Sequence, residues 1–208
     1  MNINSNVLKR FIIYMAILTF VMFTVWGFIR SFKDRPPGDY ETEVCDIRLK
    51  DKKYKEALEA ANKALNKSPG HRGALMCKAL VFISEKKYIE ADKELTNLII
   101  FLEKNLESDD KTGIGTLAAA YANRGIIKDR KKNYKEALKD YVKALGIDHE
   151  AVAGPGLGTI ILNYKFKSSS VKERALYLNE QLQLPEEERV LSIKELDEGQ
   201  VMHKPGKL

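Results

Sequence analysis

The sequence has few of the residues from which enzymes and metal sites are usually built. Of its 208 residues, two are cysteines and three are histidines. Cys45 and Cys77 form no CxxC pair, and the histidines share neither an HExxH motif nor a helical face. No serine lies in a GxSxG motif. We therefore expect no catalytic residue, no metal site and no bound cofactor.

Two short glycine-containing stretches do not supply a phosphate-binding loop either. Residues 154–159 are GPGLGT, and residues 112–116 are TGIGT. Neither stretch follows a predicted strand, has GxGxxG spacing or leads into GK[ST]. We interpret both as turns between helices.

Basic charge is concentrated at the N-terminus. The formal net charge is +6, and residues 1–35 hold five basic residues and one acidic residue, which leaves +2 for the rest. Acidic and basic residues are interspersed over that remainder, as on solvent-exposed helix faces. No basic stripe with interleaved aromatic residues is visible, so we do not expect nucleic-acid binding.

The longest uncharged run is FIIYMAILTFVMFTVWGFI, residues 11–29. As a helix it would be about 28 Å long, close to the hydrocarbon thickness of a bilayer. Tyr14 and Trp26 lie near its ends, where aromatic side chains settle among lipid headgroups, and basic residues flank it. We predict a single transmembrane helix between a short basic tail, residues 1–10, and a proline-containing linker, residues 30–40.

Two alternatives to an anchor remain open. A cleaved signal peptide would use the small residues Val25 and Gly27, although the apolar run exceeds the usual length of about 7–15 residues. A buried helix of a soluble domain is the other. The basic residues on the two flanks are nearly balanced, so the side of the membrane stays unassigned. We expect a single-pass protein of a bacterial cytoplasmic membrane, or a secreted soluble protein if the segment is cleaved.

The chain repeats itself. YKEALEAANKAL begins at Tyr54, YKEALKDYVKAL begins at Tyr134, and a weaker copy, YIEADKELTNLI, begins at Tyr88. The second copy follows the first by 34 residues and precedes the third by 46, so 12 residues are inserted into a period of 34. A 34-residue period made of two helices is the length of the tetratricopeptide repeat.

The third copy carries large and small residues in the order typical of that repeat. They are Tyr121, Gly125, Tyr134, Ala137, Tyr141 and Ala144. The chain resembles the tetratricopeptide repeat (TPR) family, which implies an all-α array of helical hairpins. Small residues would lie where helices cross, and aromatic residues would fill the space beside them. A plain helical bundle is the alternative, but the near-identity of the segments that begin at Tyr54 and Tyr134 favours the repeat.

We predict a TPR-like domain over residues 41–198, followed by a loose tail, residues 199–208. Its parts are three repeats at about 38–71, 72–105 and 118–151, an insertion at 106–117, and a degenerate fourth repeat at 152–185. We expect the middle repeat's second helix to run on for about two extra turns, then a loop, then a helix that begins near Leu117. Residues 168–184 and 184–196 are predicted to form two final helices.

The resemblance places Cys45 and Cys77 in first helices that pack side by side. A disulfide is possible in an oxidising compartment, but we favour two small, packed cysteines.

The resemblance also implies a concave groove, lined by the first helix of each hairpin, that binds a peptide or helix of another protein. The predicted groove residues are Asp46, Leu49, Lys50, Met76, Leu80, Ile83, Asn123, Ile126 and Arg130. Because the groove is apolar in the middle and charged at its ends, it suits an amphipathic segment. The alternative is that the chain's own linker, tail or insertion covers it.

We predict a membrane-anchored scaffold that binds a protein partner, for assembly or stabilisation of a membrane-associated complex. A self-associating structural oligomer is the alternative, and an undetected enzyme lacks any supporting motif.

Overall fold

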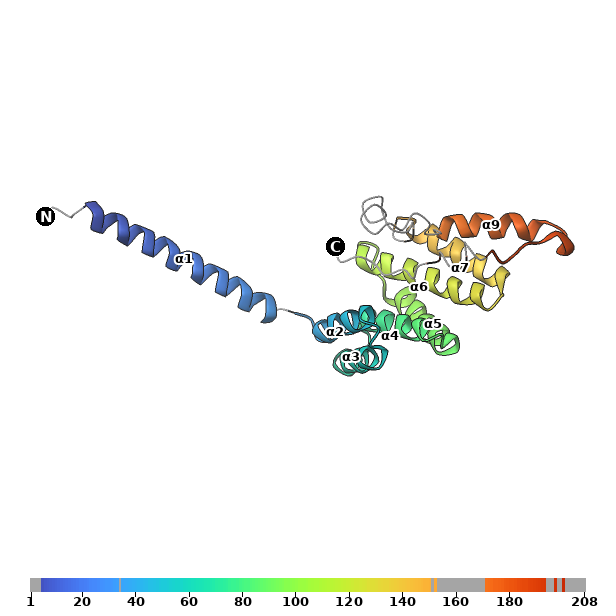
Figure 1. Cartoon of the computed structure of the whole chain (residues 1–208), viewed down its shortest axis with the longest axis horizontal. Coiled ribbons are helices and arrows are strands. Elements are labelled where there is room, and N and C mark those ends of the chain that lie inside the picture. The colour runs from blue at the N-terminus through green and yellow to red at the C-terminus, as the bar shows by residue number, and fades with distance from the viewer. Residues whose placement is uncertain are drawn as a thin grey trace. The chain divides into compact units, whose positions relative to one another are not determined.

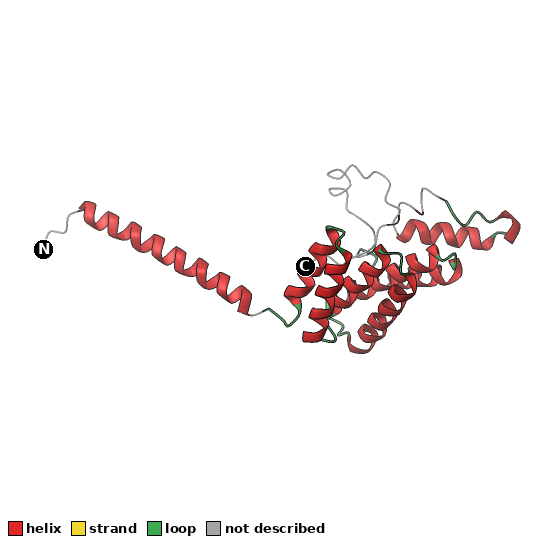
Figure 2. Cartoon of the chain, turned by 60° about the horizontal axis from the view of Figure 1, so that its bottom comes forward, coloured by secondary structure: helices red, strands yellow, loops and turns green. Residues whose placement is uncertain are grey.

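In the computed structural model, the described residues are 5–33, 35–150, 152, 171–193, 197 and 200. The chain divides into two compact units, Met1–Pro37 and Gly38–Leu208. Helices make up all of the regular structure among the described residues (Figure 2). The predicted all-α fold class is confirmed.

The first unit consists of one helix, α1 (Ser5–Lys33), which extends the predicted apolar helix at both ends. Its stretch Ser5–Arg30 is long and apolar enough to cross a membrane, and none of that stretch is buried. These properties fit both a membrane anchor and a signal sequence. Pro36 and Pro37 follow α1, and prolines do not continue a helix.

The second unit is a series of antiparallel helices (Figure 1). They are α2 (Asp39–Lys50), α3 (Tyr54–Lys67), α4 (Arg72–Ser84), α5 (Tyr88–Asn105), α6 (Lys111–Arg130), α7 (Tyr134–Ile147) and α9 (Val171–Gln183). Each of α2 to α6 packs against the next helix, and α7 packs against α9. The first helices of neighbouring hairpins, α2 with α4 and α4 with α6, also contact one another. The second unit is therefore a TPR-like stack of three hairpins.

Small residues mark the helix crossings, as the repeat pattern predicts. Ala57, Ala91 and Ala137, which are equivalent in the three repeats, are fully buried. A Cβ atom added to Gly125 would lie 2.6 Å from Cε1 of Tyr141 and 3.3 Å from the carbonyl oxygen of Ala137. No larger residue fits at this crossing of α6 and α7 unless the helices separate.

Ion pairs stabilise the first hairpin, where charged residues replace apolar ones in the repeat pattern. Glu41 accepts a hydrogen bond from Lys67 Nζ at 2.6 Å, and Arg48 lies 3.1 Å from Glu56. Each pair joins α2 to α3 at the surface of this hairpin.

The structure joins Cys45 to Cys77 by a disulfide, with the two Cα atoms 6.5 Å apart. The expectation of two packed, unbonded cysteines is therefore wrong. The direct contact between α2 and α4 brings the two side chains together, although they are 32 residues apart in sequence.

The insertion lengthens α6 as well as α5. α5 has 18 residues and α3 has 14, so the extension is about one turn instead of the two expected. α6 begins at Lys111, which makes the predicted helix start near Leu117 wrong. Gly113 and Gly115 are buried within α6, so the interpretation of TGIGT as a turn is also wrong.

An acidic cap explains the early start of α6. The backbone amide of Gly113 donates to Oδ1 of Asp110 at 2.8 Å. Asp110 also pairs with Arg72 at the start of α4, and this hydrogen bond lowers the pKa of the carboxyl group. The cap satisfies a free amide of the first helical turn, while the ion pair ties the inserted residues to the preceding repeat.

Among the described residues, part of the predicted C-terminal structure is helical. α9 confirms the predicted helix of residues 168–184 over Val171–Gln183. The three serines at its start lie outside the described residues, as do GPGLGT and most of the first half of the fourth repeat. The final predicted helix is wrong from Arg189 to Ile193. A 3-10 turn, Glu186–Glu188, is followed there by non-helical chain.

The same turn closes all three hairpins. Lys52, Lys86 and Lys132 have φ angles of 59°, 60° and 62°. Each lysine amide donates to the carbonyl oxygen three residues before it, and the following amide donates to the carbonyl five residues before it, all at 2.8–3.0 Å. This is the Schellman motif, in which glycine usually occupies the left-handed position. A lysine there costs about 1 kcal/mol.

Replacing one of these lysines with glycine should therefore stabilise the domain. We expect Lys132→Gly to leave the free energy of unfolding unchanged or raise it by up to about 1 kcal/mol, and Lys132→Val to lower it, because a β-branched residue disfavours positive φ. Denaturant unfolding of the full chain in detergent, followed by circular dichroism, measures both changes. A glycine variant less stable than the valine variant would contradict the assignment of this turn.

Candidate protein-binding site

The predicted groove residues differ widely in exposure. Five of them are at most 3% exposed, namely Met76, Leu80, Ile83, Asn123 and Ile126. Asp46 and Leu49 are half-buried, and Lys50 and Arg130 are exposed.

Part of this burial comes from the first helices themselves. Asn123 Nδ2 of α6 lies 3.6 Å from Met76 Sδ of α4, and the two helices are in direct contact. The middle of the predicted groove is thus closed, and the binding role of its residues stays a prediction.

Residues from the C-terminal part of the chain contact the same side of α6, at Asp129. The carboxylate accepts two hydrogen bonds from Arg174 of α9, both at 2.7 Å. It also accepts one from the hydroxyl of Tyr141 at 3.1 Å and one from Nε2 of Gln200 at 2.7 Å. Asp129 is 5% exposed and Arg174 is 1% exposed, so this ion pair is removed from water.

Arg174 extends the network to the following segment. Its guanidinium also donates to the carbonyl oxygen of Leu191 at 2.9 Å and lies 3.1 Å from Asp197. Burial and the charge of Asp129 together raise the pKa of Tyr141 well above its ordinary value, so the phenol stays protonated and donates. The network holds the described C-terminal residues against α6 and α7.

Removing one partner of this buried pair should destabilise the domain strongly. We expect Asp129→Ala to lower the free energy of unfolding by about 3–5 kcal/mol, because Arg174 would be left as an uncompensated buried charge. Asp109→Ala, on the exposed loop before α6, should change it by less than about 0.5 kcal/mol. Denaturant unfolding in detergent compares the two variants, and equal losses would mean that Asp129 has no special role.

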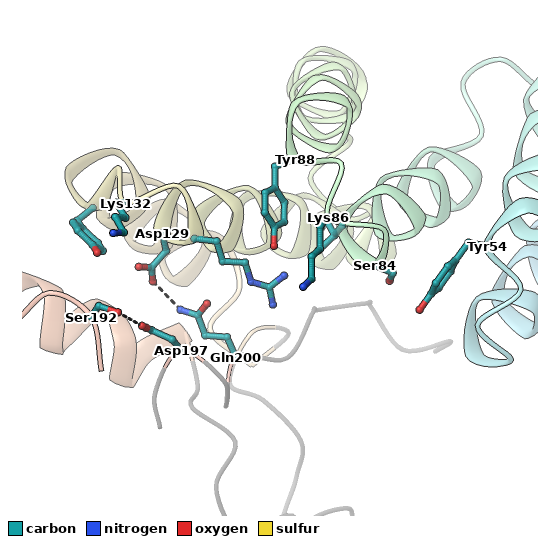
Figure 3. Close-up of a pocket in the computed structure, with 12 residues that line it drawn as sticks. Tyr54, Ser84, Lys86, Tyr88, Asp129, Lys132, Ser192, Asp197 and Gln200 are labelled. Carbon is teal, nitrogen blue, oxygen red and sulfur yellow. Dashed lines mark hydrogen bonds between the residues drawn. The ribbon is translucent and has the colours of Figure 1, made fainter. Parts of the chain in front are cut away.

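An open pocket of about 610 Å³ lies where the hairpin turns meet (Figure 3). Three tyrosines that begin the second helix of each hairpin line it: Tyr54, Tyr88 and Tyr134. Lys86, Arg130 and Lys132 come from the turns, and Asp197 and Gln200 close one side. Figure 3 shows the labelled tyrosines and lysines directed toward the open space from different hairpins.

The pocket has an excess of positive charge. Lys86, Arg130 and Lys132 are exposed, and none of them forms an ion pair with another described residue. The two carboxylates of the pocket, Asp129 and Asp197, both pair with Arg174.

The pocket tyrosines add hydrogen-bond donors. Burial is the main cause of the raised pKa of Tyr134, so its phenol is un-ionised near neutral pH. The pocket therefore offers cations and phenol donors to an anionic group.

Two of the predicted groove residues, Ile83 and Arg130, line this pocket. The sequence alone led us to interpret Tyr134 as a residue that fills the space beside a helix crossing, and the interspersed basic residues as part of solvent-exposed helix faces. A signal was present, because tyrosine and lysine recur at the same repeat positions. Asp197 and Gln200 have no such signal, since the residues that hold them against the repeats, Arg174 and Asp129, are 23 and 71 residues away.

The comparisons with known proteins add little to this geometry. No protein-family model matches the sequence, and no curated protein matches it. Among solved structures, the chain is similar to the Arabidopsis OM64 TPR domain, with 19% identity and a TM-score of 0.45 over 55% of this chain and 84% of that one. The helix pairing and the crossings described above identify a TPR-like helical domain preceded by an N-terminal apolar helix.

Proposed function

We propose that this protein is a membrane-anchored scaffold that binds a partner protein with its helical repeats and keeps it near the bilayer. One observation carries the proposal: three hairpins of a TPR-like array jointly form an open pocket lined by tyrosines and cations. Stacked helical hairpins are generally protein-interaction modules. In this proposal α1 is the anchor and the pocket is the contact site.

The anchor interpretation has support in the composition of α1. Its apolar stretch is exposed along its full length, which is costly in water and favourable in lipid. Trp26 near its C-terminal end, with Arg30 stacked 5.3 Å from the ring centroid, suits the bilayer interface.

The disulfide favours one side of the membrane for the repeats. Disulfides persist in oxidising compartments and are rare in the cytosol. With Cys45 bonded to Cys77, we place the repeat domain on the side away from the cytosol. The charge balance around α1 left this question open.

Alkylation of the two cysteines in protein taken from cells and denatured tests this topology. We expect no modification by a mass-shifting maleimide after denaturation without reductant, and modification of both thiols after reduction. A Cys45→Ala variant is the control, because its single thiol should react without reduction. Full modification of the wild type without reductant would place the repeats in the cytosol.

Site-specific photocrosslinking tests the scaffold role. A photoreactive phenylalanine analogue at Tyr88, inside the pocket, should crosslink a second protein in native membranes. The same analogue at Ile100, an exposed residue of α5 that does not line the pocket, should crosslink it at least about fivefold less. Equal yields would remove the pocket from the proposal.

The crosslinked product also separates the two candidate functions. A product that contains only copies of this chain would support the self-associating oligomer in place of the scaffold. The absence of any product at Tyr88 would contradict both functions.

A further inference from the structure

The three hairpin turns together hold a net charge equal to that of the whole chain. At equivalent repeat positions, residues 50–53 are KDKK, residues 84–87 are SEKK and residues 130–133 are RKKN. Together they carry eight basic and two acidic residues, a net charge of +6 that equals the formal net charge of the protein. We name these twelve residues the basic turn edge.

The fold gathers the turns on one edge of the domain. The three tyrosines that follow the turns, Tyr54, Tyr88 and Tyr134, line a single pocket together with cations of the second and third turns. All eight basic side chains of the basic turn edge are exposed. Among the described residues, one of these eight side chains forms an ion pair: Lys87, with Glu85 of its own turn. The positive charge is thus concentrated in space although it is dispersed in sequence.

This edge lies away from the end of the domain that the linker enters. The chain enters at Gly38, before α2, and the first turn of the edge comes after α2. A helix of 12 residues is about 18 Å long. The basic turn edge is therefore at the opposite end of α2 from Gly38.

We propose that the basic turn edge binds an extended, acidic segment of a partner protein, with its carboxylates on the turn cations. The inference rests on the proposed scaffold function and characterises the partner of that scaffold. Packed helices are about 8–10 Å apart. The cations of neighbouring turns therefore recur at about 10 Å, which is close to the rise of three residues, one full turn, of an extended polyproline II chain, in which every third side chain lies on the same face.

The pocket supplies contacts that a purely ionic surface lacks. Tyr88 and Tyr134 offer phenol donors to carboxylates, and Ile83 gives the pocket an apolar wall. An acidic residue at every third position, with an apolar residue between acids, would match both features. Exposed ion pairs are individually weak, so specificity depends on several spaced contacts made together.

Fluorescence anisotropy with defined peptides tests this inference. The probe is a labelled 12-residue peptide with glutamate at every third position and leucine, serine or glycine elsewhere. It is titrated with the full chain in zwitterionic nanodiscs. We expect binding that weakens as the salt concentration rises and that is lost when glutamine replaces every glutamate.

Two triple variants with the same change in charge decide where the peptide binds. Lys86→Gln, Arg130→Gln and Lys132→Gln together should weaken binding about tenfold. Lys93→Gln, Lys104→Gln and Lys172→Gln, which are exposed positions outside the basic turn edge, should weaken it less than about twofold. Circular dichroism checks that both variants keep the helical content of the wild type.

Several results would overturn the inference. One is that the glutamate peptide does not bind, and another is that both triple variants weaken binding equally. A third is that a peptide with its four glutamates in one block binds as tightly as the peptide with spaced glutamates. Preferential binding to vesicles that contain anionic lipid would assign the edge to a membrane surface instead. Each of these results leaves the crosslink at Tyr88 intact if the scaffold function is right, so the two proposals fail separately.

Discussion

The C-terminal part of the repeat domain depends on one buried carboxylate. Asp129 lies near the end of α6, and without partners its charge would be very costly at 5% exposure. Arg174, Tyr141 and Gln200 supply four hydrogen bonds from three different parts of the chain. Because these partners come from α9, α7 and the described C-terminal residues, the network couples the packing of all three on α6.

The same network shapes the candidate site. Arg174 pairs with both Asp129 and Asp197, which line the pocket, and offsets one of their two negative charges. Without this pairing, two carboxylates would cancel most of the charge of the turn cations. The buried Arg174 therefore increases the positive charge around the pocket and also packs the C-terminal residues against α6.

Residue spacing was sufficient to predict the hairpins, because the positions that pack recur every 34 residues. Ala57, Ala91 and Ala137 illustrate this, since each is fully buried at a crossing. Local capping was harder to predict. Asp110 begins α6 early through contacts with Gly113 and with Arg72, which is 38 residues distant. The spacing of Cys45 and Cys77 in the sequence could not decide whether they form a disulfide or remain free thiols.

The candidate site was predicted only in part, for a related reason. Ile83 and Arg130 were expected to line a binding surface, and both line the pocket. The pocket lies at the turns, however, while the middle of the predicted groove is closed by contact between α4 and α6. In the sequence each turn holds only two or three basic residues, and the summed charge of the edge becomes visible only when the hairpins are stacked.

The Cys45–Cys77 bond also has a mechanical consequence. If α1 anchors the protein and a partner binds the repeats, as proposed, a pulling force enters the repeat domain at the start of α2. Repeat arrays usually yield to tension from their ends, hairpin by hairpin. Here a covalent link passes the force from α2 to α4, so the first hairpin cannot be peeled away by itself, and the end nearest the tether is the reinforced end of the array.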